Sequence, residues 1–230
     1  EALAVARRSD VIVAALGEAS EMSGESSCRT ELSIPDVQQE LLKALVKTGK
    51  PVVLVLFNGR PLTLGWESEN VPAILDVWFG GSETADAVAD VLFGDVNPSG
   101  KLTMCFPKNV GQVPLYYAAK NTGRPLLEGR WFEKFRSNYL DVDNDPLYPF
   151  GYGLSYTTFE YSPVSLDATE VAAGRSVKAE VTVTNTGKVA GKEVVQMYLQ
   201  DVVGSTTRPV RELKGFEKIS LEPGESMRVT

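Results

Sequence analysis

The sequence of 230 residues contains no histidine and only two cysteines, Cys28 and Cys105. Without histidine the chain lacks the usual zinc patterns, and neither a Ser-His nor a Cys-His catalytic pair can form. The two cysteines are far from the C-x-x-C spacing of metal and redox motifs. We expect Cys105, which lies in an apolar stretch, to be a buried thiol. We expect Cys28, which has no base nearby to activate it, to be a packed thiol rather than a nucleophile.

Long hydrophobic runs and blocks of basic residues are also missing. The longest apolar runs, Val11–Leu16 and Val52–Phe57, are far shorter than the roughly 20 residues of a membrane-spanning helix. A net charge of −7 without a Lys/Arg block argues against nucleic acid and membrane partners, because both are bound through basic surfaces. No pattern in the sequence indicates a cofactor or a metal site. A neutral ligand fits this composition better.

The chain begins in what reads as a helix, Glu1–Arg8, with no N-cap, no initiator Met and no charged-then-apolar leader. We therefore expect it to be a piece of a longer protein, with any signal peptide lying outside it. A length of 230 residues, against a prior of roughly 150 per domain, favours two domains.

Three short segments are almost continuously apolar, which is typical of parallel strands covered on both faces. They are Asp10–Leu16, Pro51–Phe57 and Ala73–Phe79. Two other segments, Val37–Lys47 and Ser82–Phe93, repeat apolar residues at helical spacing. We expect Ser33 and Asp36 to form a capping box before the first of these helices. The alternation predicts an α/β fold over residues 1–118, a layered α/β sandwich with a mostly parallel sheet.

The pattern changes in the second half of the chain. Residues 119–157 mix Gly, Pro and Asn with many aromatic residues, which predicts an irregular connector held down by packing. From residue 158 onward, apolar and polar residues alternate, as in Val177–Val183, and a turn at Asn185–Gly187 separates this run from the next. We expect residues 158–230 to form an antiparallel all-β sandwich. We expect this sandwich to be truncated, since roughly 100 residues are needed for a complete one.

The segment after the first predicted strand is the most chemically suggestive. Ligands bind parallel sheets at the carboxyl ends of the strands, where connecting loops usually have roughly 2 to 6 residues. This loop runs from Gly17 to about Leu32 and concentrates ionisable groups. They are Glu18, Glu21, Glu25, Arg29 and Glu31. An acidic surface loop can also be merely solvated, but the length and position of this one favour a functional role.

Within this loop, the segment Gly24–Pro35 resembles the acid/base loop of family 3 glycoside hydrolases, in which a Glu stands four residues before an Arg. Further signatures of the family occur in the family's order. They are Asn58–Pro61, Gly94–Leu102, Phe106–Pro107 and Tyr148–Tyr156. The region from 158 onward, with Asn185–Gly187 and Arg211–Phe216, resembles the family's fibronectin type III-like domain. Bacterial β-glucosidases of this family, often periplasmic, are the most similar members.

The resemblance implies a retaining β-glucosidase that acts on β-glucosides or oligosaccharides without a cofactor. Glu25 matches the general acid/base of the family, and Arg29 matches the Arg that follows it. Because a guanidinium beside the acid would lower its pKa, we favour Arg29 as an anchor of the loop, and we expect Glu18 to orient the loop. The family's Asp nucleophile lies in an N-terminal barrel domain that this chain lacks. We therefore expect the isolated chain to be inactive.

Some alternatives stay open. Many family members have Asp before the Arg, where this sequence has Cys28, so local hydrogen bonding of the loop can differ. A β-xylosidase of the same family is one alternative. Another is a carbohydrate-binding or adhesive module that uses exposed aromatic residues such as Tyr198 or Phe216, although their alternation with Val and Leu favours core positions. The resemblance places the complete protein in the periplasm or outside the cell.

Overall fold

The computed structural model describes residues 1–127 and 129–230. Contacts divide the chain into two compact units. The first comprises residues 1–88 and 103–150, and the second comprises residues 89–102 and 151–230. The boundaries at residues 118 and 157 that the sequence suggested stay a prediction.

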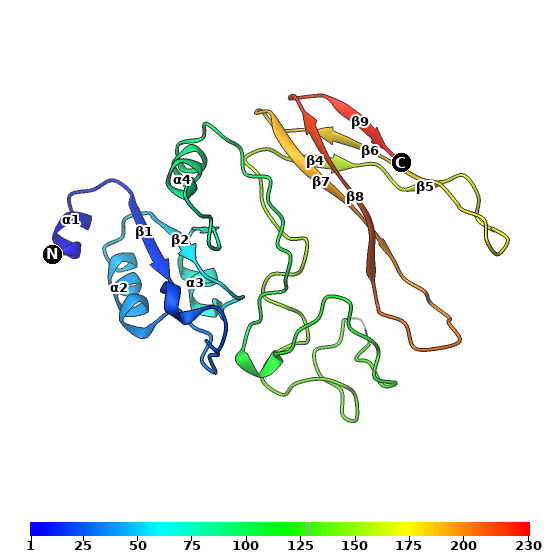
Figure 1. Ribbon diagram of the computed structural model, residues 1–230, viewed down its shortest axis with the longest axis horizontal. Coiled ribbons are helices and arrows are strands. Elements are labelled where there is room, and N and C mark those ends of the chain that lie inside the picture. The colour runs from blue at the N-terminus through cyan, green and yellow to red at the C-terminus, as the bar shows by residue number, and fades with distance from the viewer. Residues whose placement is uncertain (128) are drawn as a thin grey trace. The chain divides into compact units, whose positions relative to one another are not determined.

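The first unit has α/β architecture around a parallel sheet (Figure 1). Its elements are α1 (Ala2–Ala6), β1 (Ile12–Gly17), η1 (Ser20–Met22), α2 (Asp36–Val46), β2 (Val52–Phe57), α3 (Gly65–Asn70), β3 (Ala73–Asp76) and η2 (Val110–Gln112). Helix α4 (Thr84–Phe93) crosses from the residues of the first unit into those of the second. The strand order is β1-β2-β3, and every pairing is parallel. The predicted parallel sheet is confirmed.

Strand β2 lies between the other two strands and carries the centre of the core. Leu54 and Leu56 are fully buried, as are Leu42 of α2 and Leu62 after β2. The prediction that all three strands are covered on both faces is wrong for β1. Its side chains alternate between the two faces, and Val13 is 53% exposed in this chain.

Helix α2 begins differently from the prediction. Its N-cap is Pro35, and no side chain caps it. The predicted capping box is wrong because the helix begins at Asp36, which leaves Ser33 two residues before the N-cap, and the backbone groups of Ser33 bond within the loop. The Ser33 N–H donates to a carboxylate oxygen of Glu31, and the Ser33 carbonyl accepts a hydrogen bond from Arg29.

The segment predicted as a connector is mostly irregular and held at a few points. Within the first unit, Phe150 stacks on Tyr117 with ring centroids 4.1 Å apart, and Tyr148 packs edge-on against the buried Phe106. Cys105, beside Phe106, is buried as predicted. The aromatic residues in the middle of the segment do not pack as predicted, since all are exposed by at least 39%. They are Trp131, Phe132, Phe135 and Tyr139.

The second unit is built from antiparallel strands, as predicted. Its strands are β4 (Phe159–Tyr161), β5 (Ser165–Leu166), β6 (Ala179–Asn185), β7 (Gly191–Leu199), β8 (Glu212–Leu221) and β9 (Ser226–Val229). One sheet has the order β4-β6-β5 with β9 also on β6, and the other pairs β7 with β8. Val183, Val195, Ile219 and Leu221 form the buried core.

The aromatic residues Tyr198 and Phe216 are not in this core, so the prediction that they face inward is wrong. Phe216 pairs with Gln196, next to the core residue Val195, and therefore points to the other face of the two-stranded sheet. It is 71% exposed, and Tyr198 on the same face is 37% exposed. Alternation alone did not show which set of residues faces the core.

Gly17, at the end of β1, lies very close to the backbone of β2. Its φ is +141°, and a Cβ atom there would lie 1.8 Å from the Phe57 carbonyl oxygen. We predict that Gly17→Ala destabilises the chain by more than about 3 kcal/mol, because the obstructing atom is backbone.

Gly49→Ala is the matched control in chemical denaturation. Gly49 also has positive φ (+76°), but its Cβ would meet open space, so the expected cost is only about 1 kcal/mol. Equal losses in the two variants would show that backbone conformation, not the close approach of β1 and β2, sets the cost at Gly17.

The candidate acid/base loop

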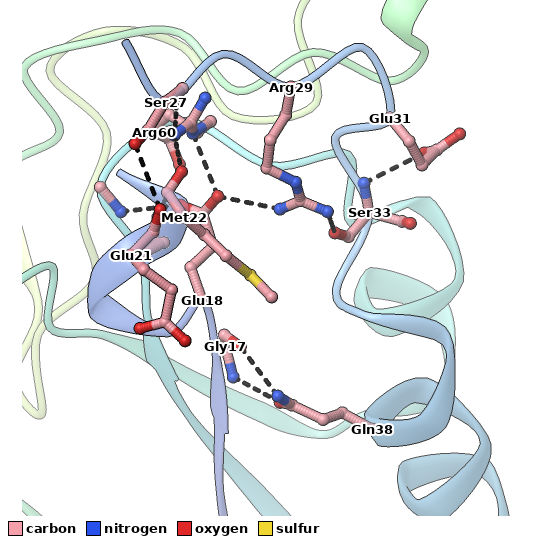
Figure 2. A network of polar contacts seen from close by, with 12 residues as sticks. Gly17, Glu18, Glu21, Met22, Ser27, Arg29, Glu31, Ser33, Gln38 and Arg60 are labelled. Atoms are coloured by element: carbon pink, nitrogen blue, oxygen red, sulfur yellow. Dashed lines mark hydrogen bonds and ion pairs between the residues drawn. The ribbon is translucent and has the colours of Figure 1, made fainter. Parts of the chain in front are cut away.

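The long loop begins where β1 ends, and its first residue is fixed to α2. The N–H of Gly17 donates to the Gln38 side-chain oxygen at 2.7 Å, and the Gln38 side-chain nitrogen donates to the Gly17 carbonyl at 3.0 Å. These reciprocal bonds, drawn in Figure 2, satisfy backbone groups that the β1 ladder leaves free. The direction in which the loop leaves the sheet is thereby set.

The carboxylate of Glu18 is the centre of the loop's polar network (Figure 2). Its side chain is completely buried. Oε1 accepts a hydrogen bond from Arg29 Nη1 at 2.8 Å, and Oε2 accepts one from the Gly59 N–H at 3.0 Å. Arg60 Nε lies 3.0 Å from Oε1, but its N–H has no hydrogen-bond geometry, so this contact is electrostatic. A buried carboxylate requires such partners, because leaving it unpaired costs several kcal/mol.

Arg29 joins the start of the loop to its exit. While Nη1 binds Glu18, Nη2 donates to the Ser33 carbonyl at 3.0 Å. Ser33 lies just before α2. The structure therefore places the guanidinium of Arg29 between two fixed points of the loop.

Arg60 reaches the same carboxylate from the turn that follows β2. Its Nη2 donates to the carbonyl oxygens of Met22 and Ser27, the latter at 3.1 Å. The turn can approach this closely because residue 59 is glycine, since a Cβ there would lie 2.1 Å from the Ser23 hydroxyl oxygen. Asn58–Pro61 is one of the family signatures in the sequence, but nothing local in the sequence predicts the role of Arg60.

Glu25 lies at the tip of a tight turn. The Ser27 N–H donates to the Gly24 carbonyl at 3.2 Å, which makes Glu25 and Ser26 the two central residues. Ser26 has φ +62°, which is uncommon outside glycine and matches the third position of a type II turn. Glu25 is exposed.

The loop's other acidic residues are engaged locally. Glu21 accepts a hydrogen bond from the Ser20 hydroxyl at 3.0 Å. A backbone N–H and this hydroxyl lower the pKa of Glu21, which makes it a poor proton donor. Glu31 accepts from the Ser33 N–H. Cys28 is exposed, so the prediction of a packed thiol is wrong: its neighbour Arg29 turns inward to Glu18.

Residues 1–127 and 129–230 contain neither a candidate metal site nor a candidate membrane-spanning helix. No group of three or more His, Cys, Asp or Glu side chains could hold a metal ion. In the same residues, no helix combines the length and apolar character that crossing a membrane requires.

Comparison with known proteins places this loop in a family context. The model for "Glycosyl hydrolase family 3 C-terminal domain" matches residues 1–156, and the model for "Fibronectin type III-like domain" matches residues 193–230. The chain belongs to glycosyl hydrolase family 3. The resemblance noted in the sequence is thereby confirmed.

Curated relatives match along the entire chain. A periplasmic β-glucosidase of Salmonella typhimurium is 54% identical over 230 residues, covering 100% of this chain and 30% of that protein. A β-xylosidase of Formosa agariphila is 49% identical, covering 100% of this chain and 31% of that protein. The chain thus spans about a third of the length of these relatives.

Solved structures of β-glucosidases share the fold. A β-glucosidase from Listeria innocua in complex with glucose is 47% identical with a TM-score of 0.94, covering 99% of this chain and 32% of that chain. A β-glucosidase from Erythrobacter marinus is 43% identical with a TM-score of 0.89, covering 99% of this chain and 30% of that chain.

One further carboxyl group at the sheet edge was not predicted from the sequence. Asp76 ends β3, and both of its carboxylate oxygens are buried. Within the described residues neither oxygen has a hydrogen bond of good geometry, although Asn58 and the Trp78 N–H lie close enough to favour the ionised form slightly. Burial dominates and raises the pKa of Asp76 from its usual 3.8 to about 6. The signal was a lone Asp at the end of an apolar run.

Asp76 makes stability depend on pH in a defined direction. Because its pKa is higher in the folded state, its contribution is fully present below about pH 4 and is lost as the pH rises through about 6. We predict that Asp76→Asn stabilises the chain at pH 7 by up to about 2 kcal/mol and flattens the profile between pH 4 and 7.

The measurement is urea denaturation of this chain at several pH values. Asp10→Asn, which changes an exposed aspartate, is the control. A slope between pH 4 and 7 that survives Asp76→Asn would contradict this account.

Proposed function

We propose that this chain is the C-terminal part of a retaining β-glucosidase, in which Glu25 is the general acid/base. One observation carries the proposal. Among the four glutamates of the loop, and within the described residues, Glu25 alone makes no hydrogen bond or ion pair, and it occupies the tip of the turn. Glu18 is occupied by its partners, and Glu21 and Glu31 are bound by neighbouring donors. Only Glu25 is free to meet a ligand at the carboxyl edge of the sheet.

The proposed reaction uses two carboxyl groups. One is Glu25 of this chain, and the other is an Asp outside it. In the first step, an Asp carboxylate from an N-terminal barrel domain attacks the anomeric carbon. As the bond to the glycosidic oxygen breaks, Glu25 gives its proton to that oxygen. In the second step, Glu25 takes a proton from water, whose oxygen displaces the Asp and releases the sugar. No cofactor takes part.

The proposed substrates are oligosaccharides and glycosides with a terminal β-D-glucosyl residue. The relatives and solved structures named as β-glucosidases support this choice. A β-xylosidase is the second candidate, because a relative with that name is almost as similar over the whole chain. The Salmonella relative supports a periplasmic location. The exposed Phe216 favours carbohydrate binding by the second unit as a further candidate function, and binding of polysaccharide to that unit tests it.

We predict that Glu25→Gln in the full-length enzyme lowers the rate on a glucoside with a poor leaving group by roughly 10²- to 10⁴-fold. Glycosylation by an activated aryl glucoside needs no proton, so its rate should fall much less. Pre-steady-state release of the aryl alcohol measures that step directly. Azide, which attacks the glycosyl-enzyme without a general base, should restore turnover of the aryl substrate.

Glu21→Gln is the matched control and should leave the ratio of the two rates unchanged. The 230-residue chain alone provides a second control, since without the nucleophile it should hydrolyse neither substrate. Equal losses on both substrates in Glu25→Gln would assign the acid/base role to another residue.

A further inference from the structure

We infer that Arg60 is the positioning residue that holds the Glu25 turn in the geometry needed for proton transfer. This inference rests on the proposed function, because it assumes that Glu25 is the acid/base. It assigns a role to a residue outside the loop, on the turn after β2.

The contacts of Arg60 enclose Glu25 in the sequence. Its Nη2 donates to the carbonyl of Met22, which precedes Glu25, and to that of Ser27, which follows it. Figure 2 shows the guanidinium of Arg60 beside both carbonyl groups and beside Glu18. One planar group therefore binds the chain shortly before the turn, at Met22, and at the end of the turn, at Ser27.

The Glu18 carboxylate fixes Arg60 in turn. Arg60 Nε lies 3.0 Å from Glu18 Oε1, and the side chain of Arg60 is only 21% exposed. The Gly59 N–H donates to the other oxygen of the same carboxylate. Since the carboxylate contacts two successive residues of this turn, the guanidinium has little freedom to swing away.

The backbone of the Glu25 turn needs such a restraint. Ser26 adopts φ +62°, a conformation that a non-glycine residue holds only where its surroundings impose it. Gly24 also has positive φ, at +120°, and a Cβ at Gly24 would meet no atom within 4 Å. Within the loop, the Ser27 hydroxyl donates to the Glu21 carbonyl at 3.2 Å and so also spans Glu25. The carbonyl contacts of Arg60 add a restraint from outside the loop, because they tie both sides of Glu25 to the turn after β2.

Arg29 provides an internal comparison. It binds the same Glu18 oxygen but holds the Ser33 carbonyl at the loop exit instead of the turn. Losing Arg29 should therefore loosen the whole loop moderately, whereas losing Arg60 should displace the acid itself. A displacement of about 1 Å is enough to cost on the order of 10²-fold in rate.

The test uses the full-length enzyme with an alkyl glucoside, which needs the acid, and an activated aryl glucoside, which does not. We expect Arg60→Ala to lower the glycosylation rate about 10- to 100-fold more on the alkyl substrate than on the aryl substrate. Arg60→Lys keeps the charge but cannot span both carbonyls, so it should show a smaller effect of the same kind. Added guanidinium should partly rescue the alkyl substrate in Arg60→Ala.

The controls separate positioning from a loss of folded enzyme. Arg8→Ala, at an exposed arginine just after α1, should change neither rate. A purely structural role of Arg60 would lower both rates by the same factor, and that result would overturn the inference. If Arg60→Ala does not fold, the ratio measured for Arg60→Lys decides in the same way. If Glu25→Gln itself shows no preference between the substrates, the proposed function fails, whatever the result for Arg60.

Discussion

A carboxylate buried directly after a β-strand needs partners, and the partners of Glu18 determine how the loops around it are arranged. Its side chain is inaccessible to solvent, and two N–H donors, from Arg29 and Gly59, converge on it together with the Arg60 cation from two different loops. Removing such a charge from water costs several kcal/mol, which only close cations and N–H groups offset. The loop after β1 and the turn after β2 must therefore come together. The position of Glu25 follows from that constraint.

The parallel sheet makes this convergence possible. Leu16 and Gly17 of β1 lie beside Leu56 and Phe57 of β2, so the two strands end side by side. Residues that follow each strand meet at the same edge although they are far apart in the sequence. Glycine at positions 17 and 59 permits the close approach, because any Cβ would collide with the neighbouring segment. Sheet, glycines and ion pairs thus act together to place one exposed carboxyl group.

The sequence was sufficient to predict the structural features that follow from a repeating residue pattern. Continuous apolar runs predicted the parallel strands, and alternation predicted the antiparallel second unit, because strand periodicity is written locally. The loop was found by its length and charge. Contacts across the sheet edge could not be predicted from local sequence patterns. Nothing local links Arg60 to Met22 and Ser27, and nothing local shows that Asp76 is buried. Phe216 was misplaced for a related reason, since alternation defines two faces without showing which one meets the core.

The measurement that tests this account most directly is amide hydrogen exchange on the chain carrying Glu18→Gln. The substitution keeps the shape of residue 18 and removes its charge. We predict faster exchange for residues 22–27 and unchanged protection in β2, because the turn is held through Arg60 while the sheet has its own hydrogen bonds. Glu40→Gln, at an exposed glutamate paired with Lys43, is the control and should change neither. Unchanged exchange at residues 22–27 in Glu18→Gln would contradict the claim that the buried carboxylate organises the candidate acid/base loop.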